Sequence, residues 1–171
     1  MTVSDEIKLQ AKLLEWEAPK GLSASIEGYE NEYYMWITNG MILARISIFS
    51  CMLNVPLLDS IERFTKLPEG AVKGWLTEMR FKDEREGMLV RAEAIEAIDV
   101  EVWVKEKYIQ LFCKAEYDVW ITPKALWLTE PDTREVLGVI ARVRGINKKL
   151  EALRCKKGDK KWTKLKQLAG F

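Results

Sequence analysis

The chain has 171 residues, of which 48% are hydrophobic and 31% charged, and its formal net charge is +1. It contains no histidine, and its three cysteines, Cys51, Cys113 and Cys155, are far apart and form no CxxC pair. This composition excludes histidine-dependent catalysis, argues against a zinc site or a disulfide framework, and suits a reducing compartment.

The N-terminal residues predict a helix over Asp5–Glu17. Ser4 can cap this helix, acidic residues follow in the first turn, and Ile7 and Leu14 lie on one face. The stretch Leu22–Asn31 is small, polar and acidic, and we interpret it as a loop. The first ten residues lack the pattern of a secretory signal, so we expect a cytoplasmic protein.

Tyr33–Ile46 is predicted to form a β-hairpin. Asn39 and Gly40 separate two runs of β-prone residues, and both tolerate the positive φ that a type I′ turn requires. A helix over Met41–Leu53 is the alternative. Trp36–Leu58 contains a single charge and is long enough to cross a bilayer, but its polar residues and proline favour a buried core over a membrane span.

Leu57–Phe81 predicts two short amphipathic helices joined by a tight turn. The turn falls at Lys66–Gly70, where Pro68 suits the first turn of the helix that follows. Helical spacing gives each helix one apolar face, made by Leu57, Leu58, Ile61 and Phe64 in the first helix and by Val72, Trp75, Leu76 and Met79 in the second.

The residues after this stretch extend the pattern. Phe81–Arg91 is a charged turn with a glycine followed by a short apolar run, and Ala92–Ile98 predicts one more helix. The order helix, turn, helix, short hairpin and helix resembles the winged helix-turn-helix domain of phage excisionases and MerR-type proteins. The resemblance covers residues 57–98 only and implies double-stranded DNA as the partner.

The resemblance also implies which residues would contact DNA. The second helix would enter the major groove with Lys73 and Thr77 near base edges, while Arg80, Lys82 and Arg85 would reach phosphates. Nonspecific electrostatic attraction would come from lysines near the C-terminus, namely Lys148, Lys149, Lys156, Lys157, Lys160, Lys161 and Lys164. Leu57–Arg91 holds seven basic and seven acidic residues, so a helical hairpin that binds no nucleic acid is the alternative.

Ile98–Cys113 fits two structures. Alternating valines over Val100–Val104, a turn at Lys105–Lys107 and a strand over Tyr108–Cys113 would make a hairpin, which β-branched and aromatic residues favour. The same residues also fit the spacing of a helix. Two short apolar runs around Pro123 are predicted to pack against the core.

A long helix is predicted from Asp132 to Cys155. Asp132 or Thr129 can cap it, and an apolar stripe follows from Val136 to Leu153. The segment Arg134–Phe171 carries 12 basic and 3 acidic residues, whereas residues 1–133 carry 15 basic and 23 acidic ones. Such a basic end on an acidic body indicates a segment that binds a polyanion or an acidic partner.

Catalytic motifs are weak or missing. Asp99, Glu101 and Lys105 resemble metal-dependent nuclease sites only crudely, and acids alternating along a strand are usually its solvated face. Neither a G-x-x-x-x-G-K-[ST] nor a G-x-G-x-x-G sequence is present. We therefore expect a protein that is not an enzyme and needs no metal or cofactor.

Together these features predict an α+β fold that is mainly helical, with the helix-turn-helix and its small wing, one or two β-hairpins and the long C-terminal helix. Residues 1–133 would form an acidic globular body, and 134–171 a basic helix and tail packed on it. The expected function is DNA binding by a regulatory or mobile-element accessory protein. The alternative is an interaction, assembly or inhibitor subunit that meets an acidic protein surface, without a membrane partner.

Overall fold

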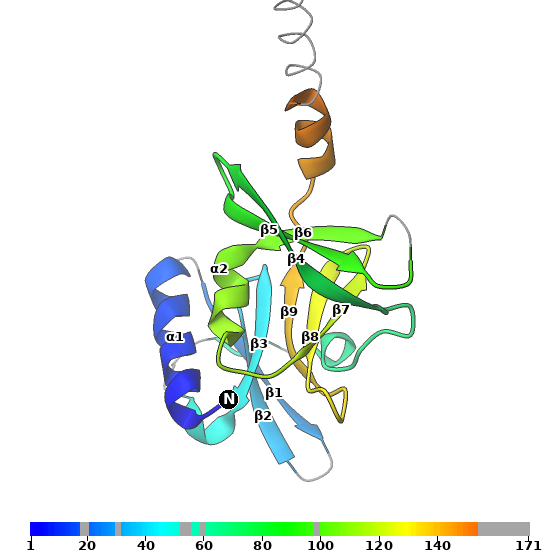
Figure 1. Ribbon diagram of the computed structural model, residues 1–171. Coiled ribbons are helices and arrows are strands. Elements are labelled where there is room, and N and C mark those ends of the chain that lie inside the picture. Colours follow the sequence, from blue (N-terminus) through cyan, green and yellow to red (C-terminus); the bar gives the residue numbers. More distant parts are fainter. Residues whose placement is uncertain (18–20, 30–31, 52–55, 59–60, 98–99, 154–171) are drawn as a thin grey trace, which may run out of the picture.

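The computed structural model describes residues 1–17, 21–29, 32–51, 56–58, 61–97 and 100–153. Over these residues, nine antiparallel strands form one sheet in the order β1-β2-β3-β9-β8-β7-β4-β5-β6 (Figure 1). Among these residues, strands far outnumber α-helices. The prediction of a mainly helical fold is therefore wrong, because most of the chain pairs as strands.

The sheet consists of three meanders, each of three strands that follow one another in the chain. The first contains β1 (Ser23–Tyr29), β2 (Glu32–Thr38) and β3 (Ile42–Ser47). The second contains β7 (Asp118–Thr122), β8 (Ala125–Thr129) and β9 (Val136–Ala141), and the third contains β4 (Val72–Asp83), β5 (Gly87–Ala94) and β6 (Glu101–Lys105). Two pairings far apart in sequence, β3 with β9 and β4 with β7, join the meanders.

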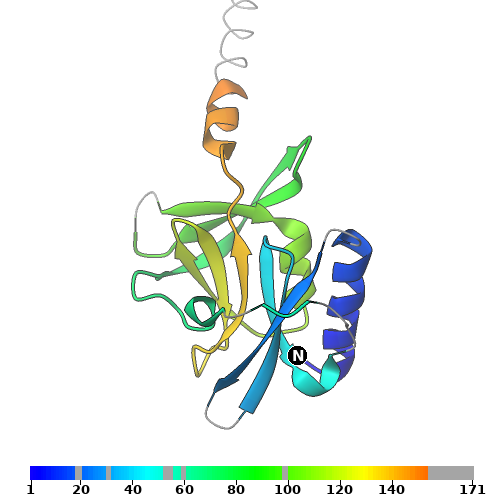
Figure 2. The same ribbon diagram turned by 180° about the vertical axis from the view of Figure 1, so that it is seen from behind.

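Two helices lie side by side at one side of the sheet (Figures 1 and 2). The first, α1 (Val3–Glu17), confirms the predicted N-terminal helix, although the Thr2 hydroxyl rather than Ser4 accepts the hydrogen bond that caps it. The second, α2 (Glu106–Ile109), places the ring of Tyr108 6.3 Å from that of Trp16 on α1. Among the described residues, no helix has the length and apolar character needed to cross a bilayer.

The main core lies between α1, α2 and the inner face of the curved sheet. β6 also lies against β7 and β8, so the third meander folds back over the second. The ring of Phe112, which follows α2 and is fully buried, sits directly over Gly138 at the centre of β9. The largest fully buried side chains include Leu9, Leu13, Ile37, Ile46, Leu126, Leu128 and Ile140.

The outer face of the central strands is also covered, by residues 61–67. Ile61, Phe64 and Leu67 of this segment pack on Trp36, Leu43, Ala125, Trp127, Val136 and Val139. Every residue of β8 is consequently buried. A strand buried on both faces shows no polar alternation, which is why Ala125–Leu128 gave only an apolar run in the sequence.

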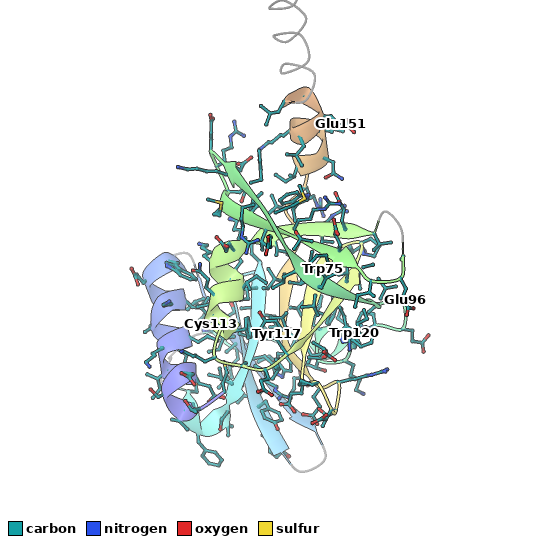
Figure 3. All side chains as sticks on the ribbon, in the orientation of Figure 1. Trp75, Glu96, Cys113, Tyr117, Trp120 and Glu151 are labelled. Carbon is teal, nitrogen blue, oxygen red and sulfur yellow. The ribbon has the colours of Figure 1, made fainter. Side chains whose placement is uncertain are left out.

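The stretch Leu57–Phe81 forms no helix-turn-helix, so the resemblance to winged DNA-binding domains is wrong. Its described residues include only a 3-10 turn at Glu62–Phe64 before β4 begins. Val72 and Leu76 pack against the main core whereas Trp75 is half exposed on β4 (Figure 3), so the side chains follow the two-residue period of a strand. The hairpin expected as a wing does exist as β4–β5, but no helix follows it at residues 92–97.

The predicted hairpin over Tyr33–Ile46 is confirmed by the pairing of β2 with β3. Its turn is not type I′, because Thr38 pairs with Leu43 and only Gly40 has a positive φ, at 84°. The Asn39 carboxamide oxygen instead accepts hydrogen bonds from two backbone N–H groups, each at 2.9 Å. The predicted loop at residues 22–31 is wrong, because most of it forms β1.

The long C-terminal helix predicted from Asp132 is wrong in its first half. Residues 136–141 form β9 at the centre of the sheet. Of the described residues from 132 onward, only 146–153 are helical. The strand predicted over residues 100–104 is confirmed as β6, which spans Glu101–Lys105, but the second strand of that hairpin is replaced by α2 and a 3-10 turn. For β9, pairing with the distant strand β3, which places Ile140 opposite Ile42, decides between strand and helix.

Candidate functional site

The residues expected to contact bases and phosphates through a recognition helix instead lie along β4, in separate surroundings. Lys73 forms an ion pair with Asp118 at 3.1 Å. Thr77 is buried where the β4–β5 register shifts, and its hydroxyl donates to a backbone carbonyl of β5 at 3.0 Å. Arg80 pairs with Glu106 of α2. These three side chains therefore do not form one basic surface.

Other residues of the predicted site do meet. A hollow of about 600 Å³ lies between the β4–β5 turn and the helical residues 146–153, and it is lined by Lys82, Arg85 and Lys149 together with Asp83 and Glu84. Lys149 pairs with Asp83, which leaves the local charge close to balanced. Lys148 is exposed on the same helical segment. The remaining predicted contacts, Lys156, Lys157, Lys160, Lys161 and Lys164, lie outside the described residues.

Asp83 fixes this helical segment to the β4–β5 hairpin. Its side chain is almost fully buried and accepts a hydrogen bond from the Lys149 ammonium. It also accepts hydrogen bonds from the backbone N–H groups of Arg85 and Glu86, at 2.9 and 3.0 Å. The Lys149 hydrogen bond first, and then the two backbone bonds, lower the pKa of Asp83 to about 2.

This lowered pKa predicts how stability changes in acid. Because the folded pKa lies below the unfolded value of 3.8, Asp83 stabilises the fold above pH 3.8 and loses that contribution as the pH falls toward 2. The free energy of unfolding, measured with urea between pH 7 and pH 2, should therefore fall less on acidification for Asp83→Asn than for the unchanged chain. Glu84→Gln, at an exposed neighbour, is the control. Equal acid slopes for Asp83→Asn and the unchanged chain would contradict the assignment.

A different surface combines an apolar hollow with free cations. The apolar hollow, of about 600 Å³, opens on the outer face of the sheet beside Leu58, Ile61 and Phe64. Buried side chains line much of it, including Leu43, Ile61, Ala125 and Val139, and the half-exposed Leu58 stands at its margin. Two exposed cations, Arg63 and Lys124, complete the lining, and none of the described residues that line it carries a carboxylate.

A second hollow, of about 420 Å³, continues from the first. The two share Gly40, Met41, Lys124 and Ala141, and the second adds Arg142 and Arg144. We call the two hollows together the basic groove, with Arg63, Lys124, Arg142 and Arg144 as its cations. Within the described part of the chain, none of these four side chains forms an ion pair.

Among the described residues that line the groove, the single acid already has a partner. Glu86, from the turn between β4 and β5, lies 2.8 Å from the Lys105 ammonium. Its carboxylate is therefore paired with a cation that does not belong to the groove lining. The potential of the groove is set by its four cations and is positive.

The fold brings these cations together because three chain turns meet at one end of the sheet. Gly40 lies between β2 and β3, Lys124 lies between β7 and β8, and residues 142–144 leave the end of β9. The buried Val143 donates its N–H to the Trp103 carbonyl of β6 at 2.7 Å. Since Val143 points inward, its two arginine neighbours are exposed.

Comparisons with known proteins give no relative. No family model matches the chain, and no match is found among curated proteins or solved structures. There is thus no family support for the winged helix-turn-helix resemblance, which the strand structure of residues 72–94 already contradicts. Among the described residues, no cluster of three histidine, cysteine, aspartate or glutamate side chains could hold a metal ion.

The groove was visible in the sequence only in part. The excess of basic residues after Arg134 includes Arg142 and Arg144, but helical periodicity placed Arg142 on the outer face of a helix. Arg63 and Lys124 belong to turns far apart in the chain, and no local pattern links them. The pairing of β3, β9 and β8 brings Lys124, Arg142 and Arg144 together, and the packing of Ile61 and Phe64 on these strands adds Arg63.

Proposed function

We propose that the protein is a non-catalytic interaction module that binds an acidic segment of a partner protein in the basic groove. The observation that supports this most directly is the gathering of four exposed cations around a groove in which the one carboxylate of the described lining, that of Glu86, is paired with Lys105. Unpaired cations beside an apolar surface attract anionic partners and orient them during the encounter. A cytoplasmic location belongs to the same proposal.

The local chemistry favours binding over catalysis. Among the described lining residues, the one carboxylate, that of Glu86, is paired with Lys105, and no cysteine or tyrosine lies beside the cations. Another polar cluster, around the buried Arg45, is held by ion pairs to Glu130 and Glu135. Neither arrangement supplies the paired acid and base that proton transfer needs.

The proposal is tested by charge reversal in the full chain. Fluorescent poly-L-glutamate, as an acidic probe, should bind the unchanged protein at low salt and less tightly as salt rises. The double variant Lys124→Glu/Arg142→Glu should bind it at least about tenfold more weakly, because two attractions become repulsions. Fluorescence anisotropy gives both affinities.

The control is Lys82→Glu/Arg85→Glu, which makes the same charge change in the hollow beside residues 146–153. Both double variants keep residues 154–171, so any attraction from that basic segment cancels in the comparison. We expect the affinity of the control variant for poly-L-glutamate to fall by less than about threefold. Equal losses in the two variants, or no binding at low salt, would refute the groove as the binding site.

A further inference from the structure

The basic groove has two chemically different parts. In the first hollow the lining is mostly apolar, with Ile42, Leu43, Leu58, Ile61, Phe64 and Val139 contributing side chains. The second hollow has less apolar surface and is lined by Arg142 and Arg144, and Lys124 lines both hollows. A ligand that fills the whole groove must therefore be apolar at one part and anionic at the next.

The strand geometry sets the distance between these two parts. Val139 lines the apolar hollow, and Arg142 follows it three residues later where β9 ends. At about 3.3 Å per residue, the arginine backbone lies roughly 10 Å beyond the valine. An extended peptide covers that distance in three or four residues.

The lining fits a peptide better than a nucleic acid. Single-stranded nucleic acids bind where their bases can stack on exposed aromatic faces. Among the described residues that line the two hollows, Phe64 has the only aromatic ring, and the Arg63 guanidinium already lies over it at 4.6 Å. The floor is otherwise aliphatic, and this suits one leucine-like or aromatic side chain.

We propose that the groove recognises a peptide segment with one large apolar side chain and carboxylates three or four residues away. The apolar side chain would occupy the hollow beside Leu58 and Ile61, and the carboxylates would meet Lys124, Arg142 and Arg144. This inference rests on the proposed function, to which it adds the chemical pattern of the partner.

Three synthetic peptides of equal length and equal charge test this pattern by anisotropy with the full chain. The first has one leucine three residues from a pair of glutamates, the second has serine in place of the leucine, and the third has the leucine ten residues from the glutamates. The first should bind about tenfold more tightly than the other two, because only it can fill both hollows at once.

Neighbouring leucines provide matched variants. Leu58 lines the apolar hollow and is 38% exposed, whereas Leu57 is 66% exposed and is outside the lining. Leu58→Ser should weaken the first peptide about threefold and leave the serine peptide unchanged. Leu57→Ser should change neither affinity. Since both leucines are exposed, these variants should fold.

The outcomes separate the two proposals. If all three peptides bind equally and Lys124→Glu/Arg142→Glu still abolishes binding, the acidic-partner function stands and the apolar anchor is refuted. If no peptide and no poly-L-glutamate binds, the function itself fails. If a random DNA duplex displaces the first peptide at lower concentration than unlabelled peptide does, the groove recognises phosphate and the peptide pattern is wrong.

Discussion

Replacing Gly138 with alanine is expected to destabilise the protein by at least about 1–3 kcal/mol, the usual effect of overpacking a core. A Cβ atom at this position would lie 2.4 Å from Cζ of Phe112 and 3.2 Å from the Leu43 carbonyl oxygen. Phe112 is fully buried and cannot move aside, and Leu43 belongs to the paired strand β3. The added methyl group must therefore separate the helical layer from the sheet or disturb the β3–β9 pairing.

Urea denaturation followed by tryptophan fluorescence measures this change. Gly70→Ala is the matched control, because a Cβ at Gly70 would meet no atom within 4 Å. We expect the free energy of unfolding of the control to lie within about 0.5 kcal/mol of that of the unchanged protein. If Gly138→Ala were equally stable, the close approach of Phe112 to β9 would be incorrect.

Removing the two carboxylates that hold Arg45 is expected to destabilise the fold by about 2 kcal/mol. The Arg45 side chain is 9% exposed, pairs with Glu130 and with Glu135, and lies 4.4 Å from the centroid of the Tyr34 ring. Glu130→Ala/Glu135→Ala leaves a buried cation without its partners. The carboxylates are 38% and 31% exposed, so solvent reduces the effect below that of a fully buried pair.

Arg45→Met should destabilise the fold less, by no more than about 1 kcal/mol. This variant removes the buried charge that needs partners, and water can reach the carboxylates that remain. Urea unfolding of both variants at pH 7 tests this asymmetry. Glu78→Ala/Glu84→Ala, at two exposed positions, makes the same charge change as the double glutamate variant and should have little effect. An Arg45→Met protein less stable than Glu130→Ala/Glu135→Ala would contradict the reasoning.

Local sequence patterns predicted those parts of the fold that local interactions decide. Helix α1 has a capping residue and an apolar face, and the β2–β3 hairpin has a glycine where a positive φ is needed. β4 was misassigned because Val72, Trp75, Leu76 and Met79 match helical spacing as well as they match a bulged strand. Its pairing with β7, more than forty residues away, favours the strand and cannot be read from local periodicity.

The candidate site was even less accessible from sequence. The excess charge after Arg134 could be seen, but the two arginines that it contributes to the groove, Arg142 and Arg144, follow the central strand β9 and do not lie on a helix. Arg63 and Lys124 stand in turns without periodicity, and their relation to Arg142 depends on the order of strands in the sheet. A binding surface assembled from turns is defined by topology, and this sequence contains no motif that fixes its topology.

The three-meander sheet has a consequence for how the chain reaches its native state. Hairpins within a meander close over short loops. The two pairings between meanders, β3 with β9 and β4 with β7, have three residue pairs each and join Ile42 to Ile140 and Gly74 to Val119. Distant contacts form late because long loops must close first. Until β9 has left the ribosome, the edge of β3 in the nascent chain therefore lacks its native partner. Assembly of the sheet, and of the groove at its end, must wait for nearly the whole described chain to leave the ribosome.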